Sequence, residues 1–223
     1  MSDLVSETEF DALAEPVQAF IRRARERLLP AAPDVSDPHV LPLHGDHEFT
    51  PPLASAAWSA PARQAAVLVP VVARPTPTVL LTQRSAELPD HAGQIAFPGG
   101  KIDPADPDPL GTALREAEEE IGLAPRFATP LGYLDPYLSR TGFRIVPAVA
   151  LIAPMFDIRL NRDEVDDAFE VPLHFLMSPE NHARHSREWK GELRTFHAMP
   201  YGERYIWGVT AGILHNLYER LYR

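Results

Sequence analysis

The chain has 223 residues, of which 45% are hydrophobic and none is cysteine, and its formal charge is −10 at pH 7. This length suits one sizeable core with an extension and is short for two full catalytic domains. The acidic balance disfavours a nucleic-acid partner, which needs a basic stripe to neutralise its phosphates. No apolar run reaches membrane-spanning length and no signal sequence begins the chain, so we expect a cytoplasmic protein without a membrane partner.

Residues 1–62 are predicted to form an extension with one helix. Pro16 fits the first turn of that helix, whose apolar positions recur at helical spacing and are Val17, Phe20, Ile21, Ala24 and Leu28. The opposite face carries four arginines and is typical of a solvated surface, although it could also pair with the acidic body or with a second subunit in a homodimer. From residue 30 to residue 61, seven prolines interrupt any period and indicate an ordered wrap or linker.

Residues 63–223 are predicted to form the main domain. Residues 65–72 and 78–83 are rich in β-branched or aliphatic side chains and should be neighbouring strands. A shorter strand-like stretch at 94–97 leads to Gly99 and Gly100, where the backbone can approach a phosphate or adopt a positive φ.

An acidic cluster lies on one turn of the helix that should follow. With Glu116 set at zero and about 100° per residue, Glu120 falls near 40° and Glu119 near 300°. The three carboxylates therefore share one face, and we expect them to point outward. A separate apolar stripe can seat the helix on a sheet and consists of Leu110, Leu114, Ala117 and Ile121.

Two interpretations of this acidic face are open. An arbitrary acidic triplet on a helix is most often solvated, but crowded carboxylates are also the hard oxygen ligands that suit Mg²⁺ or Mn²⁺. Arg115 lies next to Glu116 and four residues before Glu119, so it could hold these carboxylates in ligating rotamers or form an ordinary ion pair. Gly122 follows the helix as a C-cap.

The rest of the chain continues the alternation of strands and helices. Strands are predicted at 131–138, 143–152 and 193–199, a short helix or loop at 167–177, and an amphipathic helix at 205–222. Strands alternating with two or three helices indicate an α/β fold, an α/β/α sandwich around a mixed sheet.

The acidic helix and the glycines before it resemble a known signature, the Nudix box, in residues Gly100, Arg115, Glu116, Glu119, Glu120 and Gly122. Nudix proteins hydrolyse nucleoside diphosphates linked to another group. In the family pattern, five residues separate the glycine from a glutamate, and seven more residues separate that glutamate from Arg-Glu. This chain has Asp106 at the position of the glutamate, and eight residues separate it from Arg115. The helical glutamates are intact, and we assign Asp106 no role. The resemblance implies the Nudix sandwich, metal-dependent hydrolysis and a small nucleotide substrate.

A second motif resembles the coenzyme A pyrophosphatase branch of that family and comprises residues 80–85, Gly93, Ala96 and residues 97–100. Further stretches similar to this branch lie at 139–143, 164–165, 171–173 and 206–208. The resemblance implies cleavage of coenzyme A or its thioesters into adenosine 3′,5′-bisphosphate and the 4′-phosphopantetheine portion. Pro89 stands where the branch usually has Arg, which keeps an ADP-ribose or nucleotide-sugar pyrophosphatase as an alternative. A third hypothesis is a module that binds a nucleotide without hydrolysing it. Such a module would normally lack one of the metal-ligating residues, and none is missing here.

The candidate site residues follow from these motifs. The metal ligands are predicted to be Glu116 and Glu120, with Glu119 close behind, and Arg115 is predicted to position them. Either a helical glutamate or Glu164, from the acidic segment 163–167, is the candidate general base. The candidate contacts to the substrate are Arg84, His91, Gly99, Gly100, Lys101 and Arg144.

Overall fold

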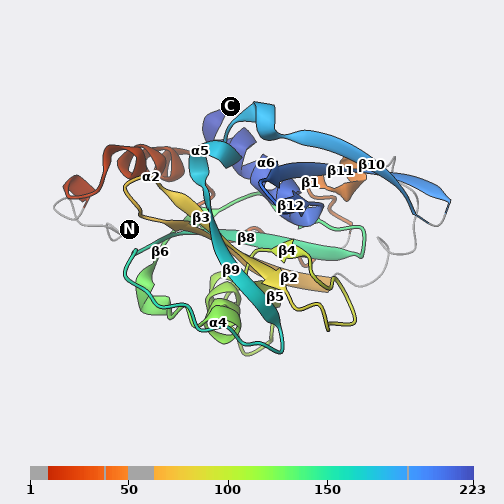
Figure 1. Ribbon diagram of the computed structural model, residues 1–223, viewed down its shortest axis with the longest axis horizontal. Helices are drawn as coiled ribbons and strands as arrows, with labels where there is room; N and C mark the ends of the chain where they lie inside the picture. Colours follow the sequence, from red (N-terminus) through yellow and green to blue (C-terminus); the bar gives the residue numbers. More distant parts are fainter. Residues whose placement is uncertain (1–9, 38, 50–62, 190) are drawn as a thin grey trace.

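The computed structural model describes residues 10–37, 39–49, 63–189 and 191–223. A mixed sheet is covered on one face by helix α4 (Pro109–Ile121) and on the other by helix α6 (Val209–Tyr222), beside which helix α2 (Glu15–Arg27) packs (Figure 1). The predicted α/β/α sandwich is confirmed. Among the described residues, we find no helix that combines the length and the hydrophobicity of a membrane span.

The centre of the main sheet is a parallel pair of long strands. Strand β2 (Arg63–Val72) pairs along its whole length with β8 (Phe143–Ile152). The strands on the far side of β8 are β6 (Ala128–Tyr133), β7 (Tyr137–Leu138) and β1 (His44–Gly45). The strands on the far side of β2 are β3 (Thr78–Arg84), β4 (Ile95–Ala96), β5 (Gly99–Lys101) and β9 (Val165–Pro172).

A smaller antiparallel sheet lies on the α6 side of the main sheet, above it in Figure 1. Its strands are β10 (Ala183–Trp189), β11 (Glu192–Tyr201) and β12 (Arg204–Trp207). The remaining short elements are the helix α5 (Leu173–Leu176) and the 3₁₀ turns η1 (Asp46–Glu48), η2 (Pro125–Phe127) and η3 (Pro179–Asn181).

The main sheet has apolar side chains on both faces, because helices cover both. Along β2, Ala66 and Leu68 pack against Ala117 of α4, whereas Val69 points into the core that contains Leu214 of α6. All five side chains are fully buried. A strand covered on both faces reads as a continuous apolar run, which is why 65–72 was recognisable from the sequence.

Two predicted elements differ in the structure. Residues 167–177 were expected to form a short helix or loop, but β9 pairs with β3 from Thr78↔Pro172 onward, and only Leu173–Leu176 is helical. The acidic residues at the start of β9 give it no strand-like pattern in the sequence. The strand is stabilised by hydrogen bonds to β3, which is distant in the chain. The helix expected from residue 205 begins only at Val209, because Gly208 has φ 63° and separates it from β12.

The boundaries of other predicted elements are refined. The strand expected at 131–138 is divided between β6 and β7, and β10 had no counterpart among the predicted strands. The predicted pairing of β2 with β3 is confirmed at Val71↔Val79 and Val72↔Thr78.

The predicted N-terminal helix is present as α2, and its apolar side is buried against the body. Its residue Phe20 belongs to the same core as Leu214 of α6. The proposed boundary between extension and domain lies at the end of 50–62, a stretch outside the described residues that also contains the second part of the proline-rich segment, so the boundary stays a prediction.

Candidate active site

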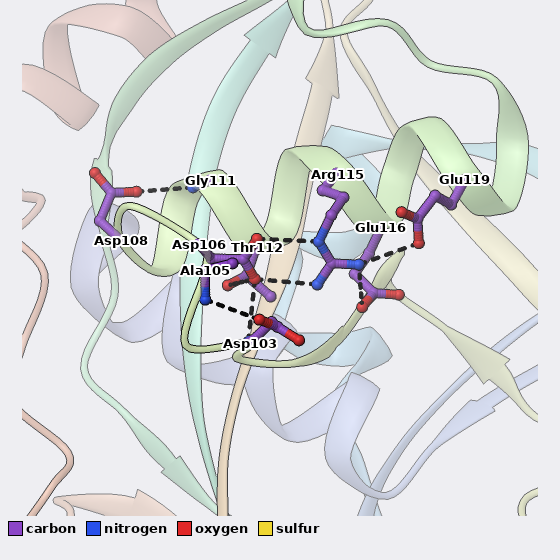
Figure 2. Close-up of polar contacts among 9 residues, drawn as sticks. All are labelled: Asp103, Ala105, Asp106, Asp108, Gly111, Thr112, Arg115, Glu116 and Glu119. Carbon is purple, nitrogen blue, oxygen red and sulfur yellow. Dashed lines mark hydrogen bonds and ion pairs between the residues drawn. The ribbon is translucent and has the colours of Figure 1, made fainter.

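Local signals at both ends of α4 determine where its glutamates lie. Asp108 caps the helix by accepting a hydrogen bond of 2.7 Å from the backbone N–H of Gly111, and Pro109 occupies the first turn (Figure 2). Gly122 ends the helix in the left-handed conformation, with φ 72°, as the sequence predicts. Glu116, Glu119 and Glu120 therefore belong to the last two turns of α4.

The glycines of β5 allow α4 to pack closely on the sheet. A Cβ atom on Gly100 would lie 2.4 Å from the carboxyl carbon of Glu116. A Cβ atom on Gly99 would lie 2.4 Å from the carbonyl oxygen of Ala66, which belongs to the neighbouring strand β2. Only glycine leaves room for the glutamate at one position and for the strand pairing at the other.

Glu120 does not point outward as the sequence analysis expected, because its side chain is buried and only 4% of the residue is exposed. Around the helix, Glu120 lies about 60° from the core residue Ala117, at the border of the apolar stripe. Burial raises the pKa of Glu120 to about 8, and the carboxylates of Glu116 and Glu164 add to this, while Arg84 and a hydrogen bond from the Gly99 backbone oppose it.

Glu116 and Glu164 complete a group of three carboxylates with Glu120. Burial raises the pKa of Glu116, and Arg115 opposes this rise, whereas Glu119 and Glu164 contribute to it. Glu164 lies on the loop before β9 and accepts a hydrogen bond of 3.0 Å from Asn161 Nδ2. The fold thus places a carboxylate from a later segment of the chain beside Glu116 and Glu120, where it could act as a general base.

Arg115 holds the outer side of this group through four contacts (Figure 2). Its Nη1 lies 2.9 Å from Glu116 Oε1 and 3.1 Å from Glu119 Oε2, so the predicted contacts to both glutamates are present. Its Nε and Nη2 each lie 3.0 Å from an oxygen of Asp106. This bidentate pairing fixes the plane of the guanidinium group and therefore the position of Nη1, which contacts both glutamates.

Asp106 is the residue that the sequence analysis left without a role. Besides Arg115, it accepts a hydrogen bond of 2.7 Å from Thr112 Oγ1, and the arginine holds the pKa of Asp106 well below its usual range. The sequence signal for this role was that Asp106 stands at the acidic position of the family pattern, although it is Asp instead of Glu and has one more residue before Arg115.

Glu119 has a more exposed position than its two neighbours. Its side chain is 54% exposed and is turned toward Arg115. Within the described ranges, no three acidic or histidine side chains are arranged as a ready metal site. In this arrangement Arg115 pairs with Glu119, and a role for Glu119 as a third metal ligand stays a prediction from the sequence.

The predicted substrate contacts are distributed unevenly around the glutamates. Arg84 lies at the end of β3 near Glu120, and its buried Nε has no hydrogen-bond partner among the described residues. Lys101 is exposed at the end of β5. His91 is exposed with φ 59°, and its Nδ1 lies 3.0 Å from Gln94 Oε1.

Arg144 has a different environment from the one expected for a substrate contact. It is only 5% exposed, and its Nη1 donates a hydrogen bond to the carbonyl oxygen of Val40. Through this hydrogen bond, the Arg144 side chain contacts the segment that precedes β1. A contact between Arg144 and a substrate stays a prediction from the sequence.

Comparison with known proteins identifies the family. Residues 62–192 match the NUDIX domain model. The chain belongs to the Nudix hydrolase family. It is 44% identical over 155 residues to a protein of Pectobacterium atrosepticum named "Uncharacterized Nudix hydrolase NudL", a match that covers 70% of this chain and 81% of the relative. The protein of the same name from Escherichia coli K12 is 42% identical over 155 residues, with the same coverage of each chain.

Nudix hydrolases generally use divalent metal ions, and the residues present here fit such an ion. Glu120 Oε2 is buried without a hydrogen-bond partner among the described residues, and Glu116 and Glu164 lie close enough to raise its pKa. Three carboxylates that repel one another in a half-buried position would be stabilised by a hard cation. Glu116 and Glu120 are therefore the residues best placed to hold it.

Proposed function

We propose that this Nudix hydrolase cleaves the diphosphate of coenzyme A or its thioesters, using Mg²⁺ or Mn²⁺, to give adenosine 3′,5′-bisphosphate and 4′-phosphopantetheine or its acyl derivative. One observation carries the proposal. Residues of the coenzyme A motif, Arg84, Gly99 and Gly100, lie directly beside the glutamates of the Nudix helix. The motif associated with the substrate and the motif associated with hydrolysis thus form one site.

The side chains divide the chemistry between them. Glu116 and Glu120 would hold the cation, with Glu119 as a third ligand, and Arg115 would position Glu116 and Glu119. When bound, a divalent cation neutralises the diphosphate oxygens and lowers the pKa of a coordinated water. Arg84 has a buried Nε with no partner among the described residues, so it can donate to a phosphate oxygen and stabilise the leaving group.

Glu164 is our choice for the general base. The helical glutamates are occupied with the cation in this scheme, whereas Glu164 is half-buried and comes from a separate segment. Its Oε1 is oriented by Asn161 Nδ2, and the backbone N–H of Ser85, next to Arg84, donates to its carbonyl oxygen at 2.8 Å. Glu164 would take the proton of the attacking water. The variant Glu164→Gln should lower kcat by more than a hundredfold with little change in KM.

The substrate proposal is tested by comparing rates on a panel of diphosphates. The purified protein is incubated with coenzyme A, acetyl coenzyme A, ADP-ribose, a nucleotide sugar, NADH and a dinucleoside polyphosphate, each with Mg²⁺, Mn²⁺ or EDTA. We expect the highest kcat/KM for coenzyme A or its thioester, and no turnover in EDTA. Fast turnover of ADP-ribose or a nucleotide sugar without cleavage of coenzyme A would reassign the substrate.

Pro89 is the feature that favours the alternative substrates. It is exposed in the loop between β3 and β4 and supplies no cation where the coenzyme A motif usually has one. If this cation is needed for the 3′-phosphate of coenzyme A, Pro89→Arg should improve kcat/KM for coenzyme A but not for ADP-ribose. Binding of nucleotides with no turnover of any panel member would instead indicate a module without activity.

A further inference from the structure

A cavity of about 580 Å³ lies on the small sheet of β10, β11 and β12. This volume is within the range of small-molecule sites, which is about 300–1,000 Å³. The cavity is lined by basic and aromatic side chains that the hydrolysis scheme does not use, among them Arg184, His185, Arg187, Phe196, Tyr205 and Trp207.

The register of the small sheet places this cavity on its outer face. Phe196 and Trp207 alternate along their strands with His197 and Ile206. Ile206 belongs to the core shared with α6, and His197 stacks on His215 of α6, so this second face is turned inward. The small sheet is on the opposite side of the main sheet from α4 (Figure 1). The cavity is therefore separate from the glutamate cluster.

The aromatic side chains offer preformed flat surfaces. The rings of Phe196 and Trp207 contact each other with centroids 5.1 Å apart, and both side chains are half-buried. His185 stacks on Tyr205, and its Nδ1 lies 2.6 Å from the tyrosine hydroxyl. Rings held in place by neighbouring rings lose little conformational entropy when a planar ligand stacks on them.

The charged side chains of the lining are cationic only, although the whole chain carries −10. The exposed guanidinium of Arg187 forms no ion pair or hydrogen bond with a described residue. Arg187 shares the outer face with Phe196, whereas Arg184 pairs with His197 and belongs to the inward face, where its guanidinium lies 5.6 Å from the ring centre of Phe49. An arginine without a carboxylate partner among the described residues suits a phosphate group, to which a guanidinium donates two parallel hydrogen bonds.

We propose that this cavity binds a nucleoside phosphate, with the base stacked on the aromatic surface of Trp207 and Phe196 and the phosphate held by Arg187. Aromatic rings alone would bind any planar apolar molecule, and an arginine alone would bind any anion. Their combination selects a ligand with both parts. The proposal goes beyond the hydrolysis of a diphosphate and does not depend on it.

The test measures binding without turnover. Isothermal titration calorimetry in EDTA compares adenosine 5′-monophosphate, which has no phosphoanhydride, with adenosine, inorganic phosphate and a short single-stranded oligonucleotide. We expect adenosine 5′-monophosphate to bind at least tenfold more tightly than adenosine or phosphate. Equal affinity for phosphate and the nucleotide, or tighter binding of the oligonucleotide per site, would overturn the proposal.

Variants locate the binding site. Arg187→Gln should weaken nucleotide binding at least tenfold, and the matched variant Arg126→Gln, an exposed arginine on η2, should have no effect. Trp207→Leu should weaken binding and Trp207→Phe should restore most of it, with a thermal melt to check folding. If Arg84→Gln abolishes binding and Arg187→Gln does not, the nucleotide occupies the glutamate site and the proposal is wrong. Because no hydrolysis is measured, failure of the proposed enzyme activity would leave this result unaffected.

Discussion

Gly100 and Glu116 are packed so closely that a single methyl group on the glycine would reach the carboxyl carbon of the glutamate, at 2.4 Å. The backbone of β5 is therefore one wall of the position that the carboxylate occupies. This relationship connects the Phe-Pro-Gly-Gly run to the helix of the Nudix box in space, and it makes the activity sensitive to the smallest possible change in β5.

Gly100→Ala should reduce activity much more than stability. The added methyl group meets the flexible end of Glu116, which can rotate away at little energetic expense but then leaves its place beside Glu120. A displacement of about 1 Å in a catalytic group can lower a rate about a hundredfold. The measurement is kcat/KM together with a thermal melt, and an active Gly100→Ala variant would show that the position of Glu116 is not needed.

Gly99→Ala is the contrasting change in the same strand. Its methyl group would meet the backbone oxygen of Ala66, which cannot move without disturbing the pairing of β5 with β2. We expect a clear fall in melting temperature in addition to lost activity. Equal stability of the two alanine variants would contradict this account of the packing.

Glu120→Gln should lower turnover by orders of magnitude and yet raise the stability of the metal-free protein. Burial and the nearby carboxylates raise the pKa of Glu120 to about 8, so ionising it at neutral pH opposes folding. Removing this charge should add about 1–3 kcal/mol to the free energy of unfolding in EDTA at pH 8. The parent should gain thermal stability on addition of Mg²⁺ and the variant should not.

The control for this change is Glu118→Gln on the exposed side of the same helix. It should leave turnover, stability in EDTA and the response to Mg²⁺ unchanged. If Glu120→Gln retains the activity of the parent, Glu120 has no part in the mechanism, and if it melts at a lower temperature in EDTA, the carboxylate cluster is not a source of repulsion.

Asp106→Asn should weaken activity through Arg115. Asparagine cannot accept both hydrogen bonds of the guanidinium, so Arg115 loses its fixed plane and positions Glu116 and Glu119 less well. Residues of this kind typically change metal affinity or activity by about 10–100-fold. The apparent Mg²⁺ affinity and kcat should both fall, whereas the exposed Asp157→Asn should behave as the parent. An unchanged Mg²⁺ titration for Asp106→Asn would remove Asp106 from the site.

Stability should fall in mild acid because of His197. Burial lowers the pKa of His197 to about 4, and the neighbouring His215 contributes, while Glu48 opposes the shift. The unfolded chain takes up this proton near pH 6.5, before the folded protein does, so stability is complete above pH 6.5 and is lost as the pH falls toward 4. The loss from this group is at most about 3 kcal/mol.

His197→Phe isolates this contribution. Phenylalanine keeps a ring against Phe49 and His215 and cannot be protonated. Chemical denaturation at several pH values between 4 and 7.5 should show a flatter profile for the variant than for the parent. Parallel profiles would mean that other groups cause the acid sensitivity.

Short-range spacing in the sequence predicts most features of the Nudix helix. Its end at Gly122 and the common face of Glu116, Glu119 and Glu120 follow from local geometry, which repeats within a few residues. The cap at Asp108 is a signal of the same local kind that the sequence analysis did not use. The contact of Arg115 with the glutamates was predictable for the same reason. Local spacing was enough for these features because the interacting groups are neighbours in the chain.

The surroundings of that helix depend on contacts between segments that are distant in the sequence. The burial of Glu120 depends on β5 and the end of β3, the arrival of Glu164 depends on the pairing of β9 with β3, and Asp106 meets Arg115 through a loop of nonstandard length. Strand pairing and loop closure join residues that are far apart in sequence, and their energies come from contacts that no short pattern contains. For the same reason β9 was missed, whereas α4 was not.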